Sequence, residues 1–129
     1  MIEEVDRDER LIEKELEESR KDLEKAEKDL EAEDYKWSIV SAYYSMFHIT
    51  KAVMFVSGYR EKGHLAILVF LDYLIKEGRL RGKYKNYYKS AKSSRESADY
   101  SCVYSEERAE EVLGYAREYN SRLEELIRL

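Results

Sequence analysis

The segment from residue 79 to residue 95, RLRGKYKNYYKSAKSSR, carries the residue types that bind nucleic acids. Lysines and arginines recur along it, with Tyr84, Tyr87 and Tyr88 between them. Basic side chains neutralise phosphates, and aromatic rings stack on unpaired bases. Two interpretations stay open: the segment binds phosphate, or it is a cationic face that docks onto an acidic helix of its own chain or of a partner. Tyr84 and Tyr87 fall on an apolar helical stripe, so we assign both to the core.

A second candidate lies in SAYYSMFHITKA, residues 41–52. On a helix Tyr44 and His48 stand one turn apart, and two serines share their side, which could make a polar pocket. A catalytic histidine needs an acid to orient it, however, and the chain has no carboxylate between Tyr35 and Glu61. We therefore interpret His48 as a core histidine bonded to a tyrosine or a backbone carbonyl.

Other groups give weaker signals. Arg60 and His64 could bind a phosphate and donate a proton, or they could simply mark the start of a helix. The two histidines lie 16 residues apart without a Glu-x-x-His pair, so we expect no metal and no other cofactor. The single Cys102 excludes an internal disulfide, and we expect it to be a buried, inert thiol.

The composition limits the class of protein. With 129 residues, no proline and five glycines, the chain is expected to form one all-helical domain over residues 1–129. Charged residues make up 40%, with much Glu and Lys and no glutamine, which is typical of proteins from thermophiles. The start of the chain is acidic and lacks an apolar core, and the longest apolar run is too short to span a membrane. We expect a soluble, cytoplasmic protein.

The net charge of −5 is unevenly distributed. Residues 1–34 carry 16 acidic and 7 basic residues, a balance of −9. Residues 76–95 carry eight basic residues against Glu77 alone, a balance of +7. The chain therefore has one strongly acidic and one strongly basic element, which keeps both the phosphate-binding and the docking interpretation open.

Apolar residues at intervals of three and four predict the elements that position these groups. The first helix ends near Glu33 or Asp34, and Asp34 caps a second, largely buried helix from 35 to 57. Gly58 ends the second helix. The first stripe comprises Ile12, Leu16, Ser19, Leu23, Ala26 and Leu30.

Three more helices are expected: 63–76, 80–98, and one that begins after its cap, Ser105. The helix over 63–76 is apolar on two neighbouring faces, which favours contact with a second subunit. No strand pattern is visible. The fold class is therefore all-α: an antiparallel four-helix bundle with an additional shorter helix. The last stripe comprises Ala109, Val112, Ala116, Tyr119, Leu123 and Leu126.

Two stretches resemble HEPN (higher eukaryotes and prokaryotes nucleotide-binding) domains. AYYSMFHITKAVMFVSGYREKGH resembles their first block, and RESADYS, after the basic helix, resembles their second. The resemblance implies an up-and-down helical bundle that dimerises. It also implies that the protein works with a minimal nucleotidyltransferase in a toxin–antitoxin-like module, and that it binds nucleotide or RNA.

Many HEPN proteins are metal-independent ribonucleases whose motif is an arginine, four to six intervening residues, and then a histidine. Here Arg95 stands at the arginine position, but Tyr100 stands where the histidine would be, and no histidine follows. We therefore expect phosphate binding without the usual ribonuclease site. The alternatives are an RNA-cleaving toxin that uses Arg95 and Tyr100, and a non-catalytic docking module. The predicted phosphate-binding residues are Tyr88, Lys89, Lys92, Arg95, Asp99 and Tyr100.

Overall fold

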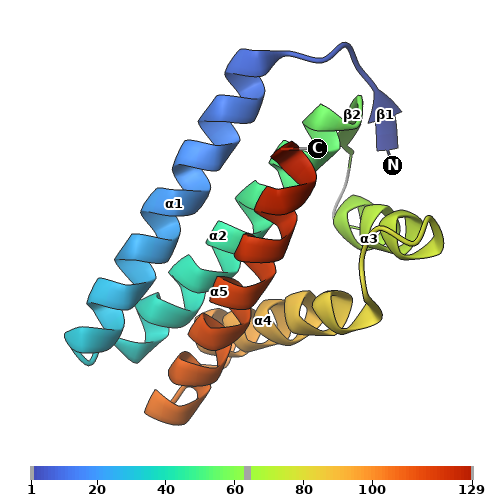
Figure 1. Cartoon of the computed structure of the whole chain (residues 1–129). Helices are drawn as coiled ribbons and strands as arrows, with labels where there is room; N and C mark the ends of the chain where they lie inside the picture. Colours follow the sequence, from blue (N-terminus) through green and yellow to red (C-terminus); the bar gives the residue numbers. More distant parts are fainter. Residues whose placement is uncertain (1, 63–64, 129) are drawn as a thin grey trace.

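The structure is a computed structural model that describes residues 2–62 and 65–128. Within these residues, helices α1, α2 and α5 lie side by side, and α4 lies across the lower parts of α2 and α5 (Figure 1). The antiparallel all-α bundle that the sequence predicts is confirmed. The elements are β1 (Ile2–Glu4), α1 (Glu9–Glu31), α2 (Tyr35–Val56), β2 (Tyr59–Glu61), α3 (Ala66–Lys76), α4 (Gly82–Tyr100) and α5 (Glu106–Arg128).

The predicted helix caps are confirmed. Asp34 precedes α2, and its carboxylate accepts a hydrogen bond from the Trp37 amide at 3.4 Å. Ser105 precedes α5, and its hydroxyl accepts one from the Arg108 amide at 3.1 Å. These side chains satisfy amides that have no partner inside the helix. Helix α2 ends just before Gly58, whose φ of +84° favours glycine.

Helix α2 forms the centre of the bundle. Of its 22 residues 14 are buried, as expected for a segment with little polarity on any side. It is long and apolar enough to span a membrane by composition, but 72% of that window is buried inside the protein, so it is a core helix. Its most extensive packing is against α1 and then α5.

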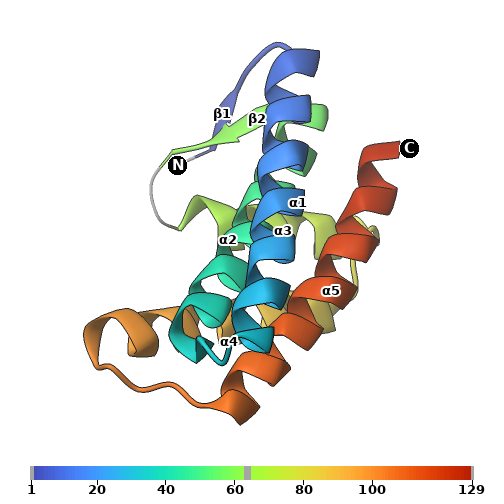
Figure 2. The ribbon, with the colours of Figure 1, turned by 90° about the vertical axis from the view of Figure 1, so that its left-hand side faces the viewer.

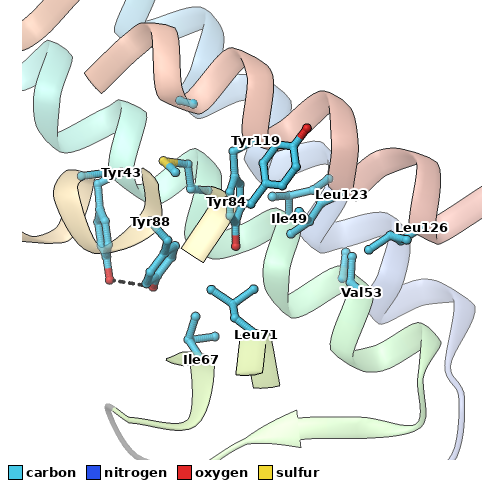
Figure 3. Packing of buried hydrophobic residues seen from close by; sticks show 14 of the residues in the cluster. Tyr43, Ile49, Val53, Ile67, Leu71, Tyr84, Tyr88, Tyr119, Leu123 and Leu126 are labelled. Carbon is cyan, nitrogen blue, oxygen red and sulfur yellow. Dashed lines mark hydrogen bonds between the residues drawn. The ribbon is translucent and has the colours of Figure 1, made fainter. Parts of the chain in front are cut away.

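Helix α5 supplies the other half of the core. All six residues of its predicted stripe are buried, from Ala109 to Leu126. Tyr119 and Leu123 of α5 pack beside Ile49 and Val53 of α2, with Leu71 of α3 close by (Figure 3). This core fixes α2 relative to α4 and α5, and so fixes the side chains described below.

Two short strands were not predicted. β1 and β2 pair antiparallel, with Ile2 opposite Glu61 and Glu4 opposite Tyr59 (Figure 2). Strands of three residues are too short to show an alternating pattern, and their pairing joins segments far apart in the chain. The pairing fixes the backbone at Glu61.

Helix α3 begins at Ala66, and the earlier part of the prediction, residues 63 and 64, lies outside the described residues. Two apolar faces were predicted for this helix. The face formed by Ile67, Phe70 and Leu74 is buried within the chain. The apolar residues that stay exposed form a different stripe, Leu65, Val69 and Tyr73. Helix α4 likewise begins two residues later than predicted, at Gly82.

Candidate functional site

A cleft of about 270 Å³ opens where α2, β2, α3 and α4 meet. Its lining combines two cations, one carboxylate and three aromatic rings. The lining residues are Tyr43, Phe47, Glu61, Ile67, Tyr88, Lys92 and Arg95.

Arg95 is the most constrained cation of this cleft. Its guanidinium carbon lies 5.0 Å from the ring centre of Tyr43 and 5.8 Å from that of Tyr44, within cation–π range. One guanidinium nitrogen, Nη1, lies 3.5 Å from Asp99 Oδ2. The Nε atom is buried and has no partner among the described residues. The side chain is only 16% exposed, so a ligand can reach this buried donor only if the guanidinium turns toward the cleft.

The charge of Arg95 is secure. Burial alone would lower its pKa, but Tyr44, Tyr43, Tyr100 and Asp99 together raise it above its ordinary value. A guanidinium that keeps its charge while partly buried interacts more strongly with a phosphate than an exposed one does, because less water screens it.

Tyr88 forms part of the wall of the cleft. It is 1% exposed, and its hydroxyl lies 3.1 Å from that of Tyr43, one donating to the other (Figure 3). Burial raises the pKa of Tyr88 above its ordinary range, so it stays a neutral phenol. Its ring is therefore packed into the core, and it offers no exposed face for stacking.

The other predicted residues fall into two groups. Lys92 lines the cleft and lies 3.4 Å from Glu96, one turn along α4. Lys89 is exposed and does not line the cleft. Asp99 contacts Arg95 from outside the lining, and Tyr100 is 79% exposed at the end of α4. The structure thus brings Tyr88, Lys92 and Arg95 into one cleft, with Asp99 behind Arg95.

Four residues of the cleft, Tyr43, Phe47, Glu61 and Ile67, are not among the predicted phosphate-binding residues. Tyr43 and Phe47 belong to the segment SAYYSMFHITKA, and both line the cleft although Tyr43 is buried. Their spacing of four, on the helix that packs against α4, was the available signal. Glu61 gave no signal, because its position depends on the pairing of β1 and β2.

Glu61 belongs to a chain of ion pairs that reaches into the bundle. Lys51 Nζ lies 3.3 Å from Glu61 Oε1 and 3.3 Å from Glu15 Oε1. His48 Nδ1 in turn lies 2.6 Å from Glu15 Oε2, and His48 Nε2 lies 3.6 Å from Asp22 Oδ2. These contacts connect α1, α2 and β2 through polar side chains that are largely withdrawn from solvent.

The expectation for His48 is therefore wrong. Its partner is the carboxylate of Glu15, not a tyrosine or a backbone carbonyl. The chain has no acid near His48 in sequence, but α1 brings two acids to it in space. Burial alone would raise the pKa of Glu15, but the hydrogen bond with His48 and the charge of Lys51 outweigh it and hold the pKa below its ordinary value. Burial raises the pKa of Asp22.

Three smaller expectations can also be compared with the structure. Cys102 is exposed in the turn after α4, with a φ of +53°, so the prediction of a buried thiol is wrong. Arg60 lies in β2 and approaches Glu3 at 3.9 Å, while His64 lies outside the described residues. Within residues 2–62 and 65–128 no group of three or more His, Cys, Asp or Glu side chains is arranged to hold a metal ion.

Among the described residues, the basic side chains of α4 form no ion pair with the acidic first helix of their own chain. Lys83 pairs with Glu118 of α5 at 2.8 Å, and Lys85 pairs with Asp72 of α3 at 2.7 Å. The acidic helix α1 is held instead by pairs with α5, such as Arg20 with Glu124 at 2.6 Å. The internal form of the docking interpretation is therefore wrong.

Chemically, the cleft can hold an anion and a flat ring together. Arg95 and Lys92 supply positive charge, and Phe47 and Tyr43 supply aromatic surface at an interplanar angle of 23°. These are the two kinds of contact that nucleotides make with proteins.

Comparison with known proteins agrees with this arrangement. A search of curated proteins found no match to the chain. The family model described as HEPN domain matches residues 12–126 of the 129, from the first turn of α1 to the last turn of α5. The match covers both blocks that line the cleft, the α2 segment and the α4 segment. The chain therefore belongs to the HEPN domain family.

Proposed function

We propose that this HEPN domain binds the phosphate of a nucleotide or of RNA in the cleft beside Arg95. The observation that carries the proposal is the state of Arg95: it is charged, held against Tyr43, and has a buried Nε without a partner among the described residues. A buried donor without a partner is unfavourable, and a phosphate oxygen would satisfy it once the guanidinium turns toward the cleft. Lys92, which lines the same cleft, would add a second positive charge.

Phosphate binding at this site makes a definite prediction for mutation. Arg95→Ala removes a charge-assisted hydrogen bond, so affinity for a mononucleotide should fall by about tenfold to a hundredfold. Isothermal titration calorimetry measures this loss. Arg81→Ala is the matched control, because Arg81 is exposed just before α4 and does not line the cleft.

Salt dependence provides an independent measurement. A phosphate contact releases counterions, so affinity for a short single-stranded RNA should fall as salt rises from about 50 to 200 mM. The slope against the logarithm of salt should be shallower for Arg95→Ala than for Arg81→Ala. Absence of any nucleotide or RNA affinity at low salt would leave docking to another protein as the remaining function.

We further propose that the protein acts as a homodimer with a minimal nucleotidyltransferase partner in a toxin–antitoxin-like module, without cleaving RNA itself. The family supports the partner and the dimer, since HEPN domains commonly show both. The lack of cleavage rests on Tyr100, an exposed phenol at the position of the usual histidine. Metal-independent RNA cleavage that Arg95→Ala abolishes would favour the alternative, a toxin that uses Arg95 and Tyr100.

A further inference from the structure

The carboxylate of Glu61 is an unexpected group in a phosphate-binding cleft. A negative charge beside Arg95 and Lys92 repels a bare anion and lowers its affinity. Glu61 lines the same cleft as the two cations and is 25% exposed at its side chain. The cleft therefore favours ligands that bring hydrogen-bond donors as well as a phosphate.

Glu61 is also fixed before any ligand arrives. Its backbone pairs with Ile2 of β1, and its Oε1 atom lies 3.3 Å from Lys51 Nζ. Lys51 is held in turn by Glu15, a buried acid that contacts His48. A carboxylate supported in this way loses little side-chain entropy on binding, and such support is typical of groups that determine specificity.

An aromatic surface lies in the same cleft. The rings of Phe47 and Tyr43 are nearly parallel, with centres 6.4 Å apart, and Phe47 is only half-buried. Base stacking on such a ring contributes to affinity for any nucleobase, since every base has a flat face. Stacking therefore retains the base, and a polar group must select among the four.

The donor pattern of the bases decides which one a carboxylate selects. Guanine presents two adjacent donors on its Watson–Crick edge, the N1–H and the 2-amino group, which match the two oxygens of a carboxylate. Adenine and cytosine present an acceptor beside their amino group, and uracil places its one N–H between two carbonyls. Each of these brings an acceptor close to the carboxylate, and a carboxylate can only accept.

We propose that the cleft recognises a guanine nucleotide, with Glu61 accepting hydrogen bonds from the N1–H and the 2-amino group. Phe47 stacks on the base, and Arg95 and Lys92 bind the phosphate. The inference rests on the proposed function and adds the identity of the base to it. A volume of about 270 Å³ suits a single nucleotide rather than a base-paired duplex.

Calorimetric titration of the full chain with GMP, IMP, AMP and CMP tests the inference. We expect GMP to bind at least about tenfold more tightly than AMP or CMP, because adenine and cytosine leave the Glu61 carboxylate without the two donors that guanine provides. IMP lacks only the 2-amino group, so its affinity should lie between those of GMP and AMP. Equal affinities for GMP, IMP and AMP would overturn the inference.

Glu61→Gln should bring the affinities for GMP and AMP together while leaving AMP binding in place. Glu4→Gln is the matched control, an exposed glutamate of the strand opposite, which does not line the cleft. If Glu61 served only to pair with Lys51, its replacement would lower stability and leave the preference for GMP unchanged. If Glu61→Gln does not fold, the comparison of GMP, IMP and AMP on the unchanged protein still decides.

The two proposals fail in different ways. Binding of all four nucleotides with equal affinity, lost in Arg95→Ala, would retain the phosphate site and reject the guanine preference. No binding of any nucleotide would reject the phosphate site itself. A short oligoadenylate, with and without one internal guanine, distinguishes a free nucleotide from RNA as the ligand. If the ligand is RNA, the internal guanine should raise affinity by a factor comparable to the preference for GMP over AMP. If the ligand is a free nucleotide, the internal guanine should leave affinity unchanged.

Discussion

Glu15 is the residue whose protonation should affect stability most directly. Its pKa is held below the ordinary value of 4.5, so the unfolded chain takes up the proton at a higher pH than the folded one does. The stabilisation is complete above pH 4.5 and is lost as the pH falls through the folded-state pKa. We expect Glu15→Gln to lose about 1–3 kcal/mol of unfolding free energy at neutral pH and to show a shallower loss on acidification. Urea denaturation between about pH 6 and pH 3 measures both effects.

Glu17→Gln is the control for this measurement, because Glu17 lies on the same helix but is exposed. Asp22 acts in the opposite direction: burial raises its pKa, so its ionisation costs stability as the pH rises. An unchanged acid profile in Glu15→Gln would mean that the contact between Glu15 and His48 contributes nothing to the pH dependence.

His48 and Arg95 show what residue-level patterns predict. Arg95 was identified because its neighbours in sequence, a basic helix and RESADYS, are informative. The environment of His48 was not predictable in the same way, since Glu15 lies 33 residues away and on another helix. Contacts within one helix follow from spacing, whereas contacts between helices depend on how the helices pack.

At the level of elements, the sequence predicted all five helices because strong apolar periodicity and few helix breakers agree along the chain. The paired strands were not predictable, although β2 carries Glu61 to the cleft. Their three-residue length leaves no period to detect, and local propensity gives no information about pairing with a distant segment.

Gly58 lies between α2 and β2, and its replacement should destabilise the fold. It has a φ of +84°, ends α2, and its carbonyl accepts a hydrogen bond from the Val5 amide at 2.9 Å. We expect Gly58→Ala to lower the unfolding free energy by about 1–2 kcal/mol, because a Cβ is disfavoured in the left-handed region. Thermal or urea unfolding measures the loss.

Gly114→Ala is the matched comparison with the opposite sign. Gly114 lies within α5, and a Cβ there meets no atom within 4 Å. Alanine favours a helix over glycine by about 0.5–1 kcal/mol, so this variant should be more stable than the original chain. A similar loss in both variants would contradict the conformational explanation for Gly58.

Across the whole molecule, ion pairs connect the helices in addition to the apolar core. Ion pairs link α1 to α5 through Arg117 and Glu27 at 3.3 Å, and α4 to α5 through Lys83 and Glu118. Exposed pairs contribute little singly at room temperature, and their networks matter more at high temperature. A thermophilic source of the chain, inferred from its composition, therefore stays a prediction.

The proposed homodimer is a property of the whole molecule, and the exposed stripe of α3 is our candidate for its contact. Leu65, Val69 and Tyr73 are 57%, 43% and 39% exposed, although the apolar residues Ile67, Phe70 and Leu74 of α3 are buried in the chain. Analytical ultracentrifugation should show a dimer, and Val69→Glu should weaken its association at least about tenfold, because a charge would be buried without a partner. Lys21→Glu, a charge change on the exposed surface of α1, should leave the dimer intact. A monomer at all concentrations would reject the dimer, and a dimer unaffected by Val69→Glu would move the contact to another surface.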